Sequence, residues 1–138
     1  MTKAFAVNVD VKAILQGEAS KRTYTWDTSA TTDLSLMLNT CADFEARGWS
    51  VGLECPVPGV QRNYRVPVVA VKQSTVLVIK SLRDPKKVDA SGLKLIDIKV
   101  ALSKTVSDLQ IRPVVYGFMA SFDEKRRSSD EYEVWLRG

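Results

Sequence analysis

The first part of the chain, residues 5–15, alternates hydrophobic and polar positions. The hydrophobic side chains that share one face of this pattern are Phe5, Val7, Val9, Val11, Ala13 and Leu15. A period of two predicts a strand in a sheet with one wet face. The segment "QGEASK" then predicts a turn, and "RTYTW" (22–26) predicts a short strand that pairs with the first as a hairpin.

The hydrophobic period changes between residues 33 and 47. Hydrophobic residues recur here at spacings of three and four, at Leu34, Met37, Leu38, Cys41 and Phe44. That stripe predicts a helix over about 33–47 that packs on a core. Thr32 or Asp33 can cap its first turn, and Gly48 can take the left-handed position after its last turn.

The middle of the chain is rich in β-branched residues. "SVGLEC" (50–55) predicts a short strand that ends at "PVPG". "RVPVVAVK" (65–72) and "TVLVIKSL" (75–82) are hydrophobic on both faces, which predicts central or sandwiched strands. Pro67 has no amide hydrogen to donate to a ladder, so it predicts an edge or a bulge near the start of the first of these two.

The remaining segments predict a loop and further strands. Charge together with Asp-Pro and Ser-Gly pairs predicts a loop over 83–92. "LKLIDIKVAL" (93–102) alternates again and predicts a strand, while 103–112 fits either a short helix or a loop. "PVVYGFMASF" (113–122) and "EYEVWLR" (131–137) predict two strands joined as a hairpin.

Together these segments indicate seven or eight strands and one clear helix. Strands dominate and seldom alternate with helices, which disfavours a doubly wound sheet. We therefore expect an α+β, β-rich fold, a twisted antiparallel sheet or sandwich with the helix at about 33–47 packed on it. The length of 138 residues predicts a single globular domain, 1–138.

Composition narrows the chemistry. The chain has no histidine, which removes His-based catalysis and His-ligated metals. Its two cysteines, Cys41 and Cys55, are too few for a four-ligand zinc site and are expected to be buried free thiols. No phosphate-cradling glycine motif occurs. We expect a protein that is not an enzyme, with no cofactor, no metal and no small-molecule substrate.

The charge balance permits an anionic partner without requiring one. The formal net charge is +4, a mild excess that suits RNA, DNA or an acidic lipid surface. No hydrophobic run approaches the roughly 18 residues of a membrane-spanning helix. The N-terminus lacks a signal-peptide pattern, so an intracellular, cytoplasmic protein is expected.

Two groups of basic residues are candidates for an anionic site. Arg62 and Arg65 flank Tyr64, so the ring can stack on a single-stranded base while the arginines hold phosphates. The alternative is a core tyrosine between two exposed arginines. The most positive segment of the chain follows a predicted strand, a common place for binding residues, and contains Lys80, Arg83, Lys86 and Lys87.

The basic run at 125–127 is a weaker candidate. Residues 123–131 carry three positive and four negative charges, so the acids offset the bases. We interpret this run as a charged, solvated loop of the C-terminal hairpin.

Four segments follow one another over residues 5–80: "FAVNVDVKAIL", "KRTYTW", "DLSLMLNTCADFEARGW" and "VQRNYRVPVVAVKQS". This order resembles the globular domain of rhabdovirus matrix proteins, which place a strand, an Arg-Thr-Tyr-like turn, a helix and basic-aromatic strands similarly. The resemblance implies a viral structural protein, a virion component, that self-associates and contacts the RNA nucleocapsid and an acidic membrane surface. Two alternatives stay open: a small single-stranded nucleic-acid-binding domain, and an inhibitor or adaptor that binds another protein.

Overall fold

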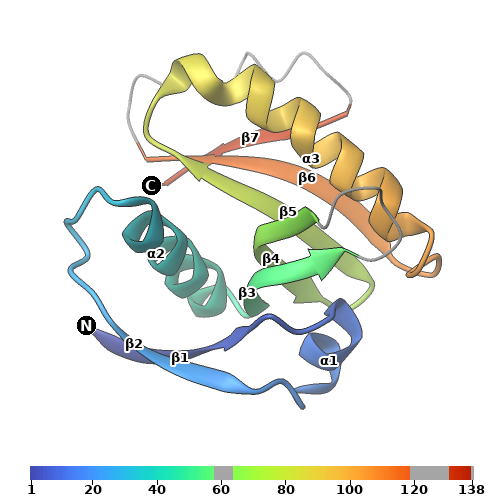
Figure 1. The fold of residues 1–138 in the computed structure, drawn as a ribbon, viewed down its shortest axis with the longest axis horizontal. Coiled ribbons are helices and arrows are strands. Elements are labelled where there is room, and N and C mark those ends of the chain that lie inside the picture. The colour runs from blue at the N-terminus through green and yellow to red at the C-terminus, as the bar shows by residue number, and fades with distance from the viewer. Residues whose placement is uncertain (58–63, 119–130, 138) are drawn as a thin grey trace.

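One continuous sheet organises the computed structural model, which describes residues 1–57, 64–118 and 131–137 (Figure 1). Its strands are β1 (Thr2–Val7), β2 (Lys21–Thr25), β3 (Ser50–Val57), β4 (Tyr64–Lys72), β5 (Thr75–Leu82), β6 (Gln110–Gly117) and β7 (Glu133–Leu136). The helical elements are α1 (Val11–Gln16), α2 (Asp33–Ala46), the 3-10 turn η1 (Pro85–Lys87) and α3 (Val88–Ser103). The expectation of an α+β, β-rich fold with a helix packed on the sheet is confirmed.

The sheet is mixed, where a wholly antiparallel one was the expectation. Its strand order is β2-β1-β3-β4-β5-β6-β7. The pairs β1–β2, β3–β4 and β4–β5 are antiparallel, and β1–β3, β5–β6 and β6–β7 are parallel. Parallel neighbours need a crossover connection, and α3 supplies one between β5 and β6.

The parallel pairing of β6 and β7 shows that the C-terminal hairpin expectation is wrong, because a hairpin joins antiparallel strands. The strand expected over 113–122 begins earlier, at Gln110, so 103–112 is divided between the end of α3, a turn and the start of β6. The basic run at 125–127 lies outside the described residues.

Residues 11–16 form a short helix, so the strand expected over 5–15 is wrong in its second half. Asp10 caps this helix by accepting a hydrogen bond from the amide of Ala13 at 2.8 Å, and Gly17 ends it with φ at 70°. Capping chemistry thus outweighs the alternation of side chains. β2 pairs antiparallel with β1, as expected for its partner strand.

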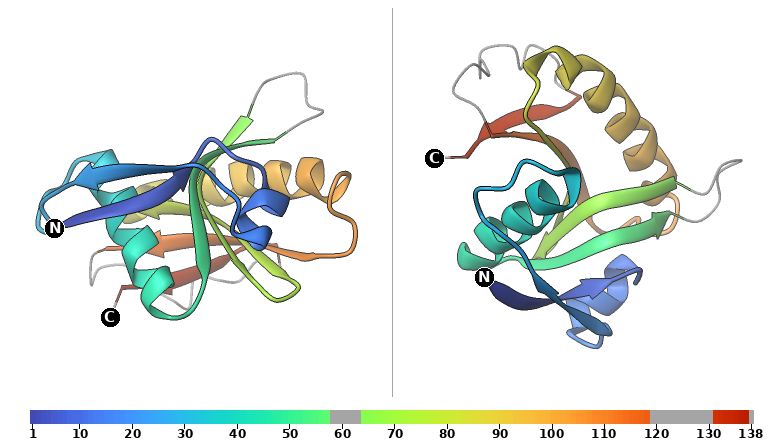
Figure 2. Two further views of the ribbon diagram at one scale, coloured as in Figure 1. Left: turned by 90° about the horizontal axis from the view of Figure 1, so that it is seen from below. Right: turned by 60° about the vertical axis from the view of Figure 1, so that its left-hand side comes forward.

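α2 confirms the helix expected at about 33–47. Thr32 caps its first turn, and Gly48 follows its end with φ at 90°. The buried face differs from the expected stripe, since Leu34 is 50% exposed while Leu36 is buried. The sheet curls around the helix, so the covered face of α2 is wider than one stripe and includes Leu36 (Figure 2).

The helix α3 replaces the second half of the loop expected over 83–92 and the strand expected over 93–102, whereas 83–87 is a bend followed by η1. Its buried positions recur at helical spacings, at Val88, Gly92, Leu95, Ile98 and Leu102. Asp84 caps the preceding turn η1 by accepting a backbone hydrogen bond at 3.0 Å, and Pro85 suits the first turn. In the strand interpretation Val100 faces the core, but it is 54% exposed.

Helices cover both faces of the curved sheet. α2 packs on the concave face against β3, β4 and β5, while α1 and α3 lie on the convex face (Figure 2). Each face therefore has its own hydrophobic core. Phe44 and Leu77 belong to the α2 core, and Leu95 and Val78 belong to the α3 core.

The central strand β4 changes faces at a proline. Val68 belongs to the α2 core, whereas Val66, two residues earlier, belongs to the α3 core. Residues two apart share a face in a regular strand, so the strand is distorted between them. Pro67 lies at this point, and the opposing Glu54 on β3 has φ at 51°. The edge or bulge expected at Pro67 is not found, because β4 is a central strand and its pairing with β3 stays one to one across the proline.

Candidate functional site

Most of the basic residues expected at a binding site lie around two adjoining pockets. Arg65 and Lys80 line a pocket of about 70 Å³. Lys80, Arg83 and Lys87 line a second one of about 240 Å³. Lys80 and Ser91 line both, so we treat them as one hollow, the basic groove. The cationic residues of the basic groove are Arg65, Lys80, Arg83, Lys87 and Lys94.

Adjacent elements explain this convergence. β5 carries Lys80, the chain then turns through Arg83 and η1, and α3 starts back across the sheet. The first turns of α3 place Ser91 and Lys94 next to one another, because residues three apart share a helix face. Arg65 arrives from β4, just before its distortion.

Lys94 was missed from the sequence because its segment was interpreted as a strand. The signal that would have found Lys94 is helical spacing, because Lys87, Ser91 and Lys94 follow one another at intervals of four and three residues. Lys86, which was expected at the site, is exposed and does not line the groove. Arg62 and the side chain of Tyr64 lie outside the described residues.

The basic groove is electropositive. Its five cationic side chains face two carboxylates, Asp33 and Asp84. Among ion pairs between described residues, none uses a cation of the groove. Arg65 is held in place by neutral partners instead, because its guanidinium donates to the side-chain oxygen of Asn8 and, at 3.5 Å, to the carbonyl of Glu54.

A cluster of aromatic rings around Phe44 lies at the other end of α2 and is the second candidate surface. The Phe44 ring stacks on Trp135 with centroids 5.7 Å apart and contacts the edge of Trp49 at 6.2 Å. It also contacts Tyr116 at 5.3 Å, and Tyr116 contacts Phe118 at 5.3 Å. Phe44 and Tyr116 are buried, whereas Trp49, Trp135 and Phe118 are half-buried.

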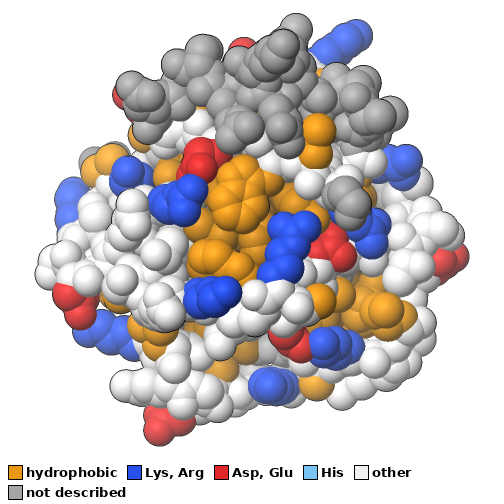
Figure 3. All heavy atoms as spheres, turned by 180° about the vertical axis from the view of Figure 1, so that it is seen from behind, with side chains coloured by type: hydrophobic (Ala, Val, Ile, Leu, Met, Phe, Trp, Pro, Cys, Tyr) orange, Lys and Arg blue, Asp and Glu red, His pale blue; other side chains and the backbone are white. Residues whose placement is uncertain are grey.

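Basic side chains lie over these rings. Arg47 lies 5.5 Å from the centroid of Phe44, Lys72 lies 5.7 Å from that of Trp49, and Arg112 lies 5.7 Å from that of Trp135. We use the name aromatic–basic surface for six residues: Arg47, Lys72, Arg112, Phe44, Trp49 and Trp135. Seen from behind, the molecule has hydrophobic side chains at its surface with Lys and Arg side chains beside them (Figure 3).

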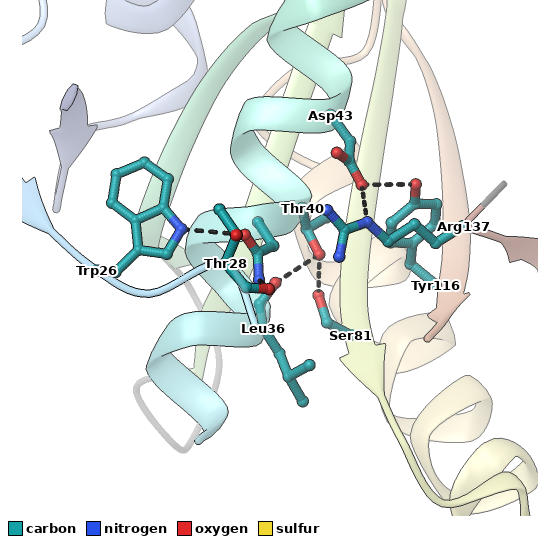
Figure 4. A network of polar contacts seen from close by, with 9 residues as sticks. Trp26, Thr28, Leu36, Thr40, Asp43, Ser81, Tyr116 and Arg137 are labelled. Carbon is teal, nitrogen blue, oxygen red and sulfur yellow. Dashed lines mark hydrogen bonds and ion pairs between the residues drawn. The ribbon is translucent and has the colours of Figure 1, made fainter. Parts of the chain in front are cut away.

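A row of polar residues on α2 fixes the helix between the two features (Figure 4). The indole N–H of Trp26 donates to Asn39 Oδ1 at 3.0 Å, and Asn39 Nδ2 donates to the carbonyl of Thr28 at 3.1 Å. At the next residue of the helix, the hydroxyls of Thr40 and Ser81 are 2.6 Å apart. These directional bonds allow α2 little freedom to slide.

The row ends at Asp43. Its carboxylate accepts a hydrogen bond from the hydroxyl of Tyr116 at 2.9 Å and pairs with Arg137 Nε at 3.0 Å (Figure 4). Burial and the neighbouring carboxylate raise the pKa of Tyr116 to about 12. The phenol therefore stays protonated at neutral pH and acts as a donor.

The two thiols do not contribute reactive chemistry. Cys41 and Cys55 are free and buried, as expected. Burial raises the pKa of Cys55 to about 12 and raises that of Cys41 as well, which keeps both in the weakly nucleophilic thiol form. Within the described residues, no three His, Cys, Asp or Glu side chains gather where they could hold a metal ion.

In comparisons with known proteins, no family model, no curated protein and no solved structure matches this chain. Among the helices that the structure describes, none is both long enough and apolar enough to cross a membrane.

Proposed function

We propose that this chain is a non-enzymatic binding protein whose basic groove holds the phosphates of a nucleic acid. The observation that carries the proposal is the convergence of cations from β4, β5, η1 and α3 around one hollow that contains two carboxylates. Lys and Arg side chains make many of the contacts that proteins form with phosphate oxygens. Such contacts recognise the backbone and not the base sequence.

The shape of the groove favours a phosphate chain over a flat lipid surface. Lys80 is half-buried between β4 and α3, where it lines both pockets. A recessed ammonium group reaches the protruding phosphate backbone of a nucleic acid more readily than it reaches headgroups in a plane. An acidic membrane is therefore a comparison arm of the test below.

Within this proposal the protein acts as a matrix-like assembly protein, as the resemblance over residues 5–80 implies. Self-association has a candidate edge in β2, the outermost strand of the sheet, of whose five residues four are exposed. An exposed strand edge can pair with the same edge of a second copy. Light scattering with and without RNA reports this association.

The groove is tested by reversing two of its charges. The double variant Lys87→Glu/Lys94→Glu is expected to weaken RNA binding and to lower the slope of log affinity against log salt by roughly two, because two phosphate contacts are lost. Fluorescence polarisation with a labelled RNA duplex over a range of salt concentrations measures both quantities.

The matched control is Lys104→Glu, an exposed lysine just beyond the other end of α3. This variant reverses one lysine charge, as each half of the double variant does, but Lys104 does not line the groove. The control is therefore expected to leave the salt slope almost unchanged. A loss half as large in the control, in proportion to its single charge reversal, would show that only net charge matters. Wild-type binding to phosphatidylserine vesicles but not to RNA at low salt would sink the nucleic-acid proposal.

A further inference from the structure

Half-buried rings lie beside the C-terminal end of α2, on the concave side of the sheet. α2 packs on β3, β4 and β5, and its Phe44 also contacts Tyr116 on β6. Among the described residues, Trp49 and Trp135 lie at the margin of this packing with cationic side chains beside them. Partly exposed rings on a sheet are a common platform for unpaired bases.

The rings of this platform are held in place before any ligand arrives. Trp135 is stacked on the fully buried Phe44 at an interplanar angle of 26°, and its indole N–H donates to Glu133 at 3.5 Å. Trp49 meets the same Phe44 ring at 81°. Rings fixed on a strand and a helix end lose little conformational entropy on binding, which favours affinity.

Cations lie beside both half-buried indoles. Lys72 lies over Trp49, and Arg112 lies over Trp135. Arg112 is oriented by two hydrogen bonds to the carboxylate of Glu133, of 2.8 and 2.6 Å. Glu133 offsets only one of the cations Arg47, Lys72 and Arg112, so the surface stays positive.

This combination fits one class of ligand better than others. A hydrophobic peptide gains nothing from the cations, and an acidic peptide has no aromatic rings that must stack. A nucleotide presents a flat π-system joined to a phosphate, which matches an indole with a cation beside it. In a duplex the bases are already stacked on one another and cannot reach the rings.

We propose that the aromatic–basic surface binds unpaired bases of single-stranded nucleic acid, with Trp49 and Trp135 as the stacking rings. The inference deepens the proposed function and rests on it for the class of partner, but it concerns a different surface. It also moves base stacking away from Tyr64, where the sequence had suggested it, to two tryptophans that lie far apart in the sequence.

The test uses tryptophan fluorescence, because the chain has three tryptophans and Trp26 is only 7% exposed. An oligouridylate of about 12 nucleotides, within the usual site size, is expected to quench the emission of Trp49 and Trp135. In the variant Trp49→Phe/Trp135→Phe the quenching is lost while most of the affinity remains, because phenylalanine still stacks.

Affinity is tested with Trp135→Ala and Lys72→Ala. Trp135→Ala is expected to weaken single-strand binding roughly 5- to 150-fold, the range for one lost stacking partner, and to leave duplex binding unchanged. Lys72→Ala removes a cation without opening the ring cluster, so it keeps the test valid if Trp135→Ala fails to fold. A smaller loss, again confined to the single strand, is expected for it.

The outcomes separate the two proposals. Loss of both single-strand and duplex binding in Lys87→Glu/Lys94→Glu, with single-strand loss alone in Trp135→Ala, supports both. Duplex binding with no single-strand quenching overturns the stacking inference and leaves the groove proposal intact. Equal quenching by polyglutamate would assign the surface to an acidic peptide and overturn the inference. A wild type that binds no nucleic acid overturns both.

Discussion

α2 and α3 cover opposite faces of the same sheet, but they are attached to it in different ways. α2 presents Asn39, Thr40 and Asp43, and each of these residues hydrogen-bonds to a neighbouring segment. α3 presents a hydrophobic stripe that includes Leu95 and Ile98. One face is therefore positioned by directional polar contacts and the other by shape and hydrophobic burial.

The difference matters because the two ends of α2 carry the two candidate surfaces. Asp33 and Leu36 line the basic groove, while Phe44 and Arg47 belong to the aromatic–basic surface. The helix of 14 residues is about 21 Å long, so the two surfaces lie at its opposite ends. A sliding helix would disturb both surfaces at once, and hydrogen bonds resist sliding better than a smooth apolar contact does.

The shape dependence of the α3 face is clearest at Gly92. A Cβ atom added there would lie 2.7 Å from ring atoms of Tyr132. A glycine in the middle of a helix normally costs stability, so here it is explained by the close approach of the ring. The hydroxyl of Tyr132 then donates to Asp89 at 2.6 Å, which links the residue before β7 to α3.

The largest expected effect tests whether α3 depends on hydrophobic burial. Leu95→Ala is expected to lower the free energy of unfolding by about 2–5 kcal/mol, because it removes a side chain that is 2% exposed and leaves a cavity. The control Val100→Ala, on the exposed side of the same helix, should cost less than about 0.5 kcal/mol. Urea denaturation measures both, and equal losses would contradict the orientation of α3.

A middle-sized effect tests the polar attachment of α2. Thr40 donates its hydroxyl proton to the carbonyl of Leu36 at 2.8 Å, so the proton between Thr40 and Ser81 must come from Ser81. Thr40→Val leaves the buried Ser81 without that acceptor and should cost about 1–3 kcal/mol.

A double-mutant cycle sharpens this result. Adding Ser81→Ala to Thr40→Val removes the unpaired hydroxyl and should recover part of the loss, with a coupling of about 0.5–3 kcal/mol. Additive losses in urea denaturation would mean that the two hydroxyls do not interact. The polar attachment of α2, which distinguishes it from α3, would then be contradicted.

The smallest effect at neutral pH concerns the two tyrosines. The hydrogen bond with Asp89 and burial raise the pKa of Tyr132 to about 12, and burial with the neighbouring Asp43 raises that of Tyr116 to about 12. The ordinary value in an unfolded chain is about 10. Because the folded pKa is higher, the stabilisation is complete below about pH 10 and is lost between about pH 10 and 12.

Tyr132→Phe and Tyr116→Phe should each cost about 1 kcal/mol at neutral pH and reduce the alkaline loss of stability. Denaturation of the wild type and both variants at about pH 9 and 11 measures this, on either side of the ordinary tyrosine pKa. A wild type whose stability is equal at both pH values would contradict the protonated state of these phenols in the fold.

The sequence predicted the part of the basic groove whose residues are close together along the chain. Lys80, Arg83 and Lys87 lie close together along the chain, so their joint position follows from a turn after a strand. Arg65 and Lys94 join them only through β4 and α3, and that meeting depends on strand order and on the crossover. Short-range charge patterns carry no information about which strands become neighbours.

The aromatic–basic surface was not predicted at all. Phe44 and Trp49 come from the end of one segment and Trp135 from another far along the chain, and each looks like an ordinary core or strand residue by itself. They meet because the parallel addition of β7 to β6 brings Trp135 to the end of α2.

What the sequence alone determined is the β-rich class, the helix α2 with a cap at Thr32 or Asp33, and the central strands β4 and β5. These depend on local periodicity and capping, both of which act within a few residues. Only the tertiary structure decided that 88–103 is a helix and that the sheet is mixed. In that segment alternation and helical spacing coexist, and packing against the convex face of the sheet selects between them.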